Sequence, residues 1–181
     1  MTNKEYDCIV IGGGHAGIEA AHAAAKLGAC TMLLTIRIDT IGAMSCNPSI
    51  GGLGKGQLTR EIDALGGVMG LATDATGLQF RLLNRSKGPA VQSPRAQSDK
   101  YAYKSFMQQY LAGVENLEIV QGIAAEILVA DAKVRGVTTT DGREFACRSA
   151  IITAGTFLRG IMHTGPEQTP AAEEVSRRAM N

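Results

Sequence analysis

The feature that most constrains the fold is a glycine-rich turn between an apolar run and an alanine-rich segment near the start of the chain. Asp7–Ile11 is a short apolar run typical of a buried parallel strand, and Gly-Gly-Gly-His-Ala-Gly follows it at residues 12–17. An alanine-rich segment, predicted to be a helix, runs to Lys26 and is closed by Gly28. Cys30–Leu34 is predicted to be the next strand. This order of strand, Gly-x-Gly-x-x-Gly, helix and strand is the context that the dinucleotide-binding fingerprint requires.

Each glycine of this turn has its own physical role. Gly12 is expected to make the tight turn, Gly14 to let the backbone approach a pyrophosphate, and Gly17 to let the helix pack closely on the strand. The pyrophosphate would then lie at the positive end of the helix, bordered by His15. The predicted cofactor-binding residues of the turn are Gly12, Gly13, Gly14, His15, Ala16 and Gly17.

The carboxylate that usually holds a ribose hydroxyl is missing from its expected place. It should end the second strand, about 20 residues after the turn, and Thr35 stands there instead. Thr35 can still donate or accept a hydrogen bond. Arg37 follows closely and leaves open an NADP site, in which an arginine contacts the 2′-phosphate. The alternative is that Arg37 is a solvated loop cation.

Composition directs the search toward local sites. With 181 residues, 45% hydrophobic and 19% charged, the chain suits one soluble globular domain or slightly more. A net charge of +1 gives no global basic field for nucleic acid, so any such contact must be local. The spacing of the four cysteines indicates a reducing compartment, and no apolar run reaches the ~20 residues of a membrane span. We expect a cytoplasmic protein without signal peptide, membrane segment or metal site.

Residues 44–56, Met-Ser-Cys-Asn-Pro-Ser-Ile-Gly-Gly-Leu-Gly-Lys-Gly, form an unusual loop. It fails as a Walker phosphate loop, because Ser49 stands where the first glycine is needed before Gly54-Lys55. No Cys-x-x-Cys pair exists either. We therefore predict a reactive thiol at Cys46, held beside cofactor and substrate, as nucleophile or acid/base. The alternative is a buried, inert cysteine, and we accept that for Cys8, Cys30 and Cys147.

The middle of the chain is predicted to contain a helix over 57–65, a strand over 78–83 and a helix over 97–111, with a polar loop over 84–97. Lys87 and Arg95 on this proline-containing loop are candidates for binding a phosphate or carboxylate of a substrate, and solvated surface is an equal alternative. Lys55 is a third substrate candidate.

A run of strands follows. The predicted strands cover 117–121, 124–129, 134–139 and 143–147, and a last apolar strand then runs into a small-residue turn over 150–156. A three-stranded meander that returns to a parallel strand is typical of flavoproteins with two dinucleotide-binding domains. In that class the final turn, here Gly155-Thr156, approaches the flavin nucleotide again. The predicted fold class is α/β: a Rossmann-like FAD-binding domain with a parallel sheet and a three-stranded antiparallel meander, glutathione-reductase-like in class. Residues 1–165 form this domain, and 166–181, a loop and then a helix from about Ala171, begin a following segment.

Several long motifs resemble one family. "GGGHAGIEAA", "TIGAMSCNPSIGGLGKG", "EIDALGG", "QFRLLNRSKGPAVQSPRAQSD" and "AGTFLRG" are together similar to the MnmG (GidA) tRNA-modifying flavoproteins over residues 5–165. The resemblance implies an FAD-dependent enzyme that acts with an MnmE-type GTPase on the wobble uridine of tRNA. It would add a carboxymethylaminomethyl or aminomethyl group at C5, using methylenetetrahydrofolate and NADH. The resemblance also implies that the backbone around Ala124 faces the adenine. The family has threonine at the place of Thr35, which weakens the NADP alternative.

The resemblance also indicates what this chain lacks. The family's chain is several times longer and homodimeric, with an NADH-binding insertion and a helical region that contacts tRNA and the GTPase. We therefore expect a fragment, or a record with residues missing, that is inactive alone. Two hypotheses remain: the FAD-binding part of a tRNA-modifying enzyme, or a nucleotide-binding module without turnover of its own.

Overall fold

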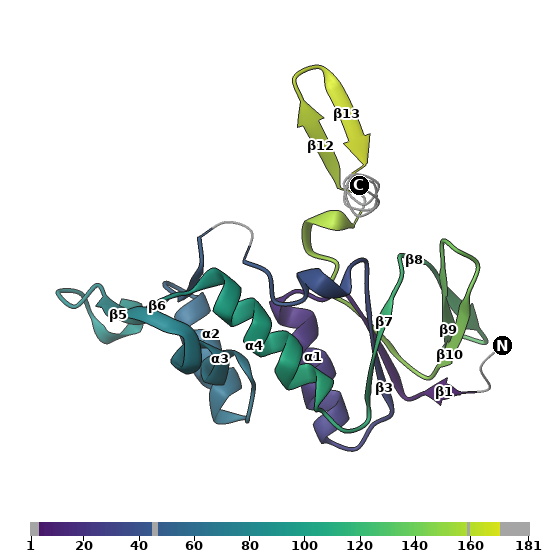
Figure 1. Ribbon diagram of the computed structural model, residues 1–181, viewed down its shortest axis with the longest axis horizontal. Helices are drawn as coiled ribbons and strands as arrows, with labels where there is room; N and C mark the ends of the chain where they lie inside the picture. Colours follow the sequence, from purple (N-terminus) through teal and green to yellow (C-terminus); the bar gives the residue numbers. More distant parts are fainter. Residues whose placement is uncertain (1–3, 45–46, 159, 171–181) are drawn as a thin grey trace. The chain divides into compact units, whose positions relative to one another are not determined.

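The computed structural model describes residues 4–44, 47–158 and 160–170. The chain forms two compact units, one from Met1–Ile41 with Val114–Asn181 and one from Gly42–Gly113 (Figure 1). Each unit is described by itself. None of the described helices is both long enough and apolar enough to cross a membrane.

A parallel sheet is the centre of the first unit. Its strands are β2 (Cys8–Ile11), β3 (Thr31–Thr35), β7 (Leu117–Gln121) and β11 (Ala150–Ile152), in the order β11-β2-β3-β7. All three pairings are parallel. In chain order this is fourth, first, second, third, which read in reverse is the 3-2-1-4 part of the Rossmann strand order. The α/β fold with a parallel sheet is therefore confirmed.

Helix α1 (His15–Lys26) connects β2 to β3. Its alanines favour helix, and Ile18, Ala21 and Ala25 recur at helical spacing and are almost fully buried. The helix ends at Leu27, after which Gly28 adopts a φ of +90°. A left-handed residue after the last turn favours glycine, so the predicted end of the helix is confirmed.

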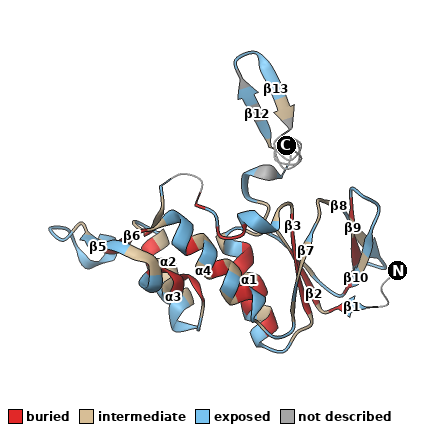
Figure 2. Cartoon of the chain, in the orientation of Figure 1, coloured by how far each residue is buried: buried red, intermediate tan, exposed pale blue. Residues whose placement is uncertain are grey.

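A second sheet contains the meander. Its strands are β1 (Glu5–Tyr6), β8 (Ala124–Ala130), β9 (Lys133–Thr139) and β10 (Glu144–Cys147), in the order β1-β10-β9-β8. The last three are antiparallel neighbours, as predicted, and β1 adds a parallel edge beside β10. One buried cluster joins the two sheets (Figure 2). Its members are Tyr6, Ile9, Met32, Leu34, Val137 and Cys147.

The second unit combines a small antiparallel sheet with three helices. Its elements are β4 (Ser49–Gly51), α2 (Lys55–Ala64), α3 (Met69–Thr76), β5 (Gly77–Leu83), β6 (Ser93–Ser98) and α4 (Lys100–Ala112). The strands pair in the order β4-β6-β5. Asp99 starts α4, because its carboxylate accepts hydrogen bonds from the backbone N–H groups of Tyr101 and Ala102.

Three local predictions were wrong or incomplete. The end of the polar loop expected over 84–97 is a strand, β6, so Arg95 lies on a sheet and not on a loop. Helix α3 and strand β4 were not expected. The loop predicted from residue 165 is part of a hairpin of β12 (Ile161–Thr164) and β13 (Glu167–Pro170). The apolar strand from Ala150 runs into a tight turn as predicted: β11 ends at Ile152, and a 3-10 turn, η3 (Gly155–Phe157), follows. The helix predicted from about Ala171 lies outside the described residues.

Candidate functional site

The predicted cofactor residues of the first unit gather at one edge of its parallel sheet. Parallel strands present their carboxyl ends at the same edge, and ligands of open α/β sheets bind there. The fingerprint turn follows β2, Thr35 ends β3, Ala124 follows β7, and Gly155-Thr156 follow β11. The structure thus brings residues from four strands to one edge. Their contact with a cofactor stays a prediction.

Gly12 makes a tight turn against the strand that follows the meander. Its N–H donates to the Leu34 carbonyl at 2.8 Å, and its φ is +115°. Thr153 closes the other side, since its backbone N–H and its Oγ1 both donate to the Ile11 carbonyl, at 2.8 and 2.9 Å. A Cβ on Gly12 would lie 2.6 Å from the Thr153 carbonyl oxygen. Sequence reasoning missed Thr153, whose only signal was its place directly after an apolar strand.

Gly17 and Gly14 differ sharply in the space around them. A Cβ on Gly17 would overlap the Gly12 carbonyl oxygen, so only glycine allows α1 to lie this close to the turn. Gly14 is exposed, and a Cβ there would meet no other described atom within 4 Å. Close packing at one glycine and open space at the other is the geometry that a pyrophosphate needs.

The positive end of α1 points into this open space. Gly14 is its N-cap residue and offers no side-chain cap, and its first turn contains no acidic residue. The helix therefore does not neutralise its own N-terminal partial charge with side chains of its first turn. An anionic group placed there would be stabilised by the backbone N–H groups and the helix dipole. Half-buried His15 is the first helical residue and borders this place.

The ribose position holds a buried threonine. Thr35 is 5% exposed, and its Oγ1 donates to the Arg37 carbonyl at 3.4 Å. It also packs against the turn, since a Cβ on Gly13 would come within 2.8 Å of the same Oγ1. Beside it, Arg37 forms a two-pronged ion pair with Asp39, with Nε and Nη2 at 2.9 and 2.6 Å from the two carboxylate oxygens. This hydrogen bonding raises the pKa of Arg37 and engages its planar fork, which weighs against a 2′-phosphate site.

Two further backbone segments border the same edge. The N–H of Gly122 donates to the Thr35 carbonyl at 2.8 Å, so the turn that leads into Ala124 lies beside the end of β3. Gly155 has a φ of +56° and open space around it, and Thr156 is exposed. The Gly155-Thr156 segment therefore presents accessible backbone at this edge.

The reactive-cysteine prediction cannot be placed, because Ser45 and Cys46 lie outside the described residues. The three other cysteines are free thiols; Cys8 and Cys147 are buried and Cys30 is half-buried. Burial raises the pKa of Cys147, which keeps that thiol protonated and agrees with the inert role expected. Among the described residues no three metal-ligating side chains come together.

Two of the three substrate candidates meet at Ser49, three residues after Cys46. Lys55 Nζ donates to the Ser49 carbonyl at 3.4 Å, and Arg95 Nη2 donates to Ser49 Oγ at 3.3 Å. Lys55 is half-buried, and burial lowers its pKa. Lys87 lies on the exposed loop between β5 and β6, where its side chain makes no hydrogen bond or ion pair with the described residues.

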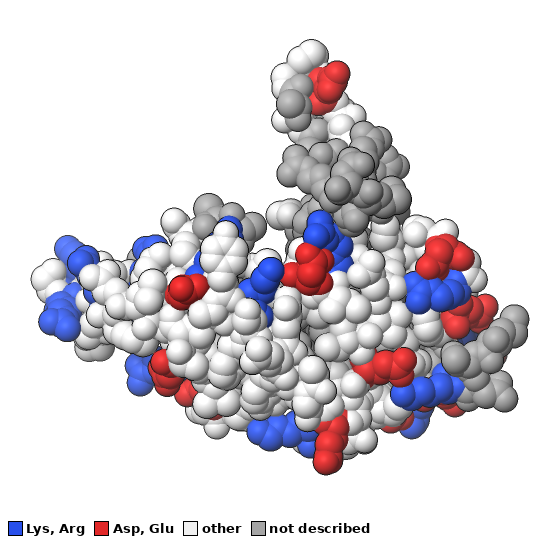
Figure 3. Space-filling model, viewed as in Figure 1, with Lys and Arg blue, Asp and Glu red and all other residues white. Residues whose placement is uncertain are grey.

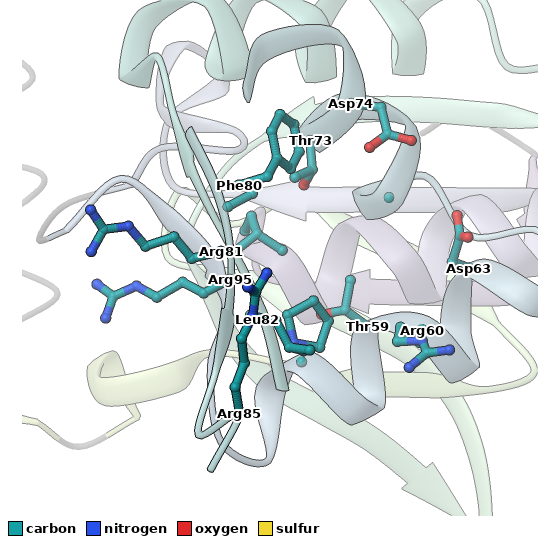
Figure 4. A pocket seen from close by; sticks show the side chains of 16 residues that line it. Thr59, Arg60, Asp63, Thr73, Asp74, Phe80, Arg81, Leu82, Arg85 and Arg95 are labelled. Carbon is teal, nitrogen blue, oxygen red and sulfur yellow. The ribbon is translucent and has the colours of Figure 1, made fainter. Parts of the chain in front are cut away.

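A cleft that sequence reasoning missed lies between the small sheet and helices α2 and α3. Its volume is about 430 Å³ (Figure 4). Thr59, Asp63 and Asp74 line it on the helix side, and Phe80 lines it on the strand side. Sequence reasoning proposed none of these four as site residues, because they become neighbours only when the second unit folds; Arg95, a predicted substrate residue, also lines the cleft.

Comparison with known proteins assigns the chain to a family. The family described as "Glucose inhibited division protein A" matches residues 7–180. A protein of Campylobacter fetus named "tRNA uridine 5-carboxymethylaminomethyl modification enzyme MnmG" is 54% identical over 97% of this chain and 29% of its own length. One of the same name from Protochlamydia amoebophila is 53% identical over 88% of this chain and 26% of its own. The chain thus spans little more than a quarter of these relatives.

Solved structures agree with this assignment. The structure of Aquifex aeolicus GidA in its form II crystal is 50% identical, with a TM-score of 0.88 over 95% of this chain and 28% of that one. A GidA-related protein from Thermus thermophilus, 20% identical with a TM-score of 0.63 over 92% of this chain and 60% of that one, shares the fold. The family resemblance and the fold class inferred from the motifs are therefore both confirmed.

Proposed function

Because this chain belongs to the glucose inhibited division protein A family, we propose that it is the FAD-binding part of a flavoenzyme that modifies uridine in tRNA. The proposed product carries a carboxymethylaminomethyl or aminomethyl group at C5 of the wobble uridine. The names of the relatives supply the reaction, and the residues of this chain supply the reason for placing a nucleotide cofactor here.

One observation carries the cofactor assignment. Gly17 is packed against Gly12 with no room for a Cβ, while Gly14 stands open at the uncapped positive end of α1. These residues fit an adenine dinucleotide, whose pyrophosphate would take the place above Gly14. Thr35 would contact the adenosine side of the cofactor, and the Ala124 backbone would face the adenine. Gly155 and Thr156 would approach the flavin side.

FAD is favoured over NADP by the pairing of Arg37 with Asp39. A guanidinium already held by a carboxylate would have to exchange that partner before it could bind a 2′-phosphate. When bound, FAD would supply two-electron redox chemistry that amino-acid side chains lack. NADH would serve as reductant through a part of the longer relatives that this chain does not span.

Cys46 is the proposed catalytic residue. Its thiolate would add to C6 of the uracil ring, which makes C5 nucleophilic toward a one-carbon unit from methylenetetrahydrofolate. Loss of the C5 proton and departure of the thiolate would then restore the ring. Acid/base action by the same thiol is the alternative role. Lys55 and Arg95, which both contact Ser49, would hold an anionic group of the substrate together with Lys87.

The partners follow from the same premise. We propose that the complete protein acts in the cytoplasm as a homodimer with an MnmE-type GTPase. We also propose that the present chain binds the cofactor without turnover of its own.

The experiment that tests this function uses the complete protein with the GTPase and GTP, tRNA, the folate donor, NADH, and glycine or ammonium, whose nitrogen bonds to the transferred one-carbon unit as tetrahydrofolate leaves. Cys46→Ser is nearly isosteric and should keep FAD bound, while the modification rate falls by about a hundredfold or more, because an alcohol is rarely ionised near neutral pH. Cys30→Ser is the matched control and should keep the rate. A Cys46→Ser enzyme that modifies tRNA at the wild-type rate would remove Cys46 from the mechanism.

A further inference from the structure

Two arginines stand directly opposite each other on neighbouring strands of the second unit. Arg81 on β5 and Arg95 on β6 are Cα partners in the antiparallel register. Directly opposed residues point to the same face, with Cβ atoms about 4.5–5.5 Å apart, and like charges at such positions repel each other. Figure 4 shows both guanidinium groups extending together on the side of the strands opposite to Thr59 and Thr73. Arg81 and Arg95 also belong to the residues that line the cleft, so the pair borders that cleft from the strand side.

Hydrogen-bonding side chains lie next to the pair on this face. Gln79 and Gln97 form the neighbouring opposed pair, and Ser49 on β4 pairs with Gln97 from the other side. Among the described residues, the Arg95 side chain donates a hydrogen bond only to the Ser49 hydroxyl. The Arg81 side chain makes no ion pair or hydrogen bond with any of them. The two charges thus lie side by side without a carboxylate among the described residues to compensate them.

The surrounding segment is basic and contains no acid. Residues 77–98 include four cations and no aspartate or glutamate, although the whole chain has a net charge of only +1. The cations are Arg81, Arg85, Lys87 and Arg95. Figure 3 shows blue side chains at the tip of the β5–β6 hairpin with no red beside them. A concentrated positive charge of this kind attracts anions locally, without a global basic field.

We propose that Arg81 and Arg95 form a phosphate clamp that binds the backbone of an RNA on this face of the β4-β6-β5 sheet. Guanidinium groups present fixed forks that match phosphate oxygens, and one phosphate between them would relieve their repulsion. Arg85 and Lys87 continue the basic surface to the hairpin tip, which fits a polyanion better than a single small anion. The proposal rests on the proposed function, because the relatives' names make tRNA the substrate.

The test uses the full 181-residue chain and a fluorescently labelled tRNA anticodon stem-loop, with binding followed by anisotropy at several salt concentrations. Arg81→Gln and Arg95→Gln should each weaken binding by about tenfold, the loss expected for one charge-assisted contact. Each should also reduce the slope of log K against log salt by about 1. Lys133→Gln, an exposed cation on β9 of the other unit, is the matched control and should leave that slope unchanged.

Thermal unfolding separates a binding role from a structural one. If the pair exists to bind phosphate, removing one charge relieves repulsion, so the melting temperature of each free variant should stay the same or rise. A fall in both melting temperatures with unchanged salt slopes would assign the arginines to the fold and overturn the clamp.

Three further outcomes also decide the matter. A wild-type chain that does not bind the stem-loop at low salt would overturn the proposal. The proposal would also be overturned if Arg81→Gln lost binding of folate polyglutamate but kept RNA binding, because the face would then bind folate carboxylates and not RNA. FAD content, measured on the same samples, reports separately on the proposed function. A chain that binds no FAD but still binds RNA through the two arginines would support the phosphate clamp and refute the proposed FAD-binding function.

Discussion

Replacing Gly14 by valine should abolish FAD binding without unfolding the chain. A Cβ at this position meets no other described atom within 4 Å, so the protein itself has room for the new side chain. The backbone is also compatible, with φ of −79° and ψ of −177°. The added methyl groups would instead occupy the space of the pyrophosphate and shield the N–H groups at the start of α1.

The expected magnitude follows from the bonds that are lost. Losing two charge-assisted hydrogen bonds to the pyrophosphate, each worth about 1.5–3 kcal/mol, removes roughly 3–6 kcal/mol of binding free energy. That corresponds to a dissociation constant raised by about 10²- to 10⁴-fold. The cost to folding is much smaller, because valine replaces glycine only at the N-cap. We expect about 1 kcal/mol at most, or a fall of about 2–4 °C in melting temperature.

The assay is fluorescence titration of apoprotein with FAD, together with thermal unfolding. Gly88→Val is the matched control, because Gly88 also has open space and a negative φ, −62°, but lies on the β5–β6 loop. It should bind FAD like the wild type. Stoichiometric FAD with unchanged affinity in Gly14→Val would refute the assignment of the pyrophosphate to this turn. Gross unfolding of Gly14→Val would refute the claim that the open space exists.

Three other substitutions test the physical reading of the fold. Gly17→Ala should destabilise the chain by about 1–3 kcal/mol in urea unfolding, because its Cβ would overlap the Gly12 carbonyl, and an unchanged midpoint would contradict this packing. Asp99→Ala should cost about 1 kcal/mol by the same measurement, since α4 loses its cap; a fully stable variant would show that the cap contributes nothing. Hydrogen bonding from Arg143 holds the pKa of Asp141 below its usual value, so this pairing stabilises the fold above the usual pKa of about 3.9 and is lost as pH falls through the folded pKa. Asp141→Asn should therefore lower stability at pH 6 more than at pH 2, and equal losses at both pH values would exclude the linkage.

The cofactor edge was predictable because its signals are local in sequence. An apolar run followed by Gly12, Gly14 and Gly17 fixes a strand, a turn and a helix start within a few residues. The threonine at position 35 could be located by counting. Its buried hydrogen bond to the Arg37 carbonyl could not, because that contact depends on how the chain leaves β3.

The second unit was predicted less well for a physical reason. Strand β6 reads Ser-Pro-Arg-Ala-Gln-Ser, which has neither β-branched residues nor a hydrophobic alternation. Its buried positions are small: Ser93, Ala96 and Ser98. The strand forms because β4 and β5 pair with it on both sides. Long-range pairing of this kind has no signal in the local sequence. For the same reason, the sequence did not predict that Arg81 and Arg95 lie opposite each other.

The central claim is that this chain is a flavoprotein domain, and the most direct test is the visible spectrum of the purified 181-residue protein with the cofactor released and quantified. We expect a flavin band, one FAD per chain after reconstitution, and no tight binding of NADPH. A colourless chain that does not take up FAD but binds NADPH would contradict it, and would point to Arg37 exchanging Asp39 for a 2′-phosphate.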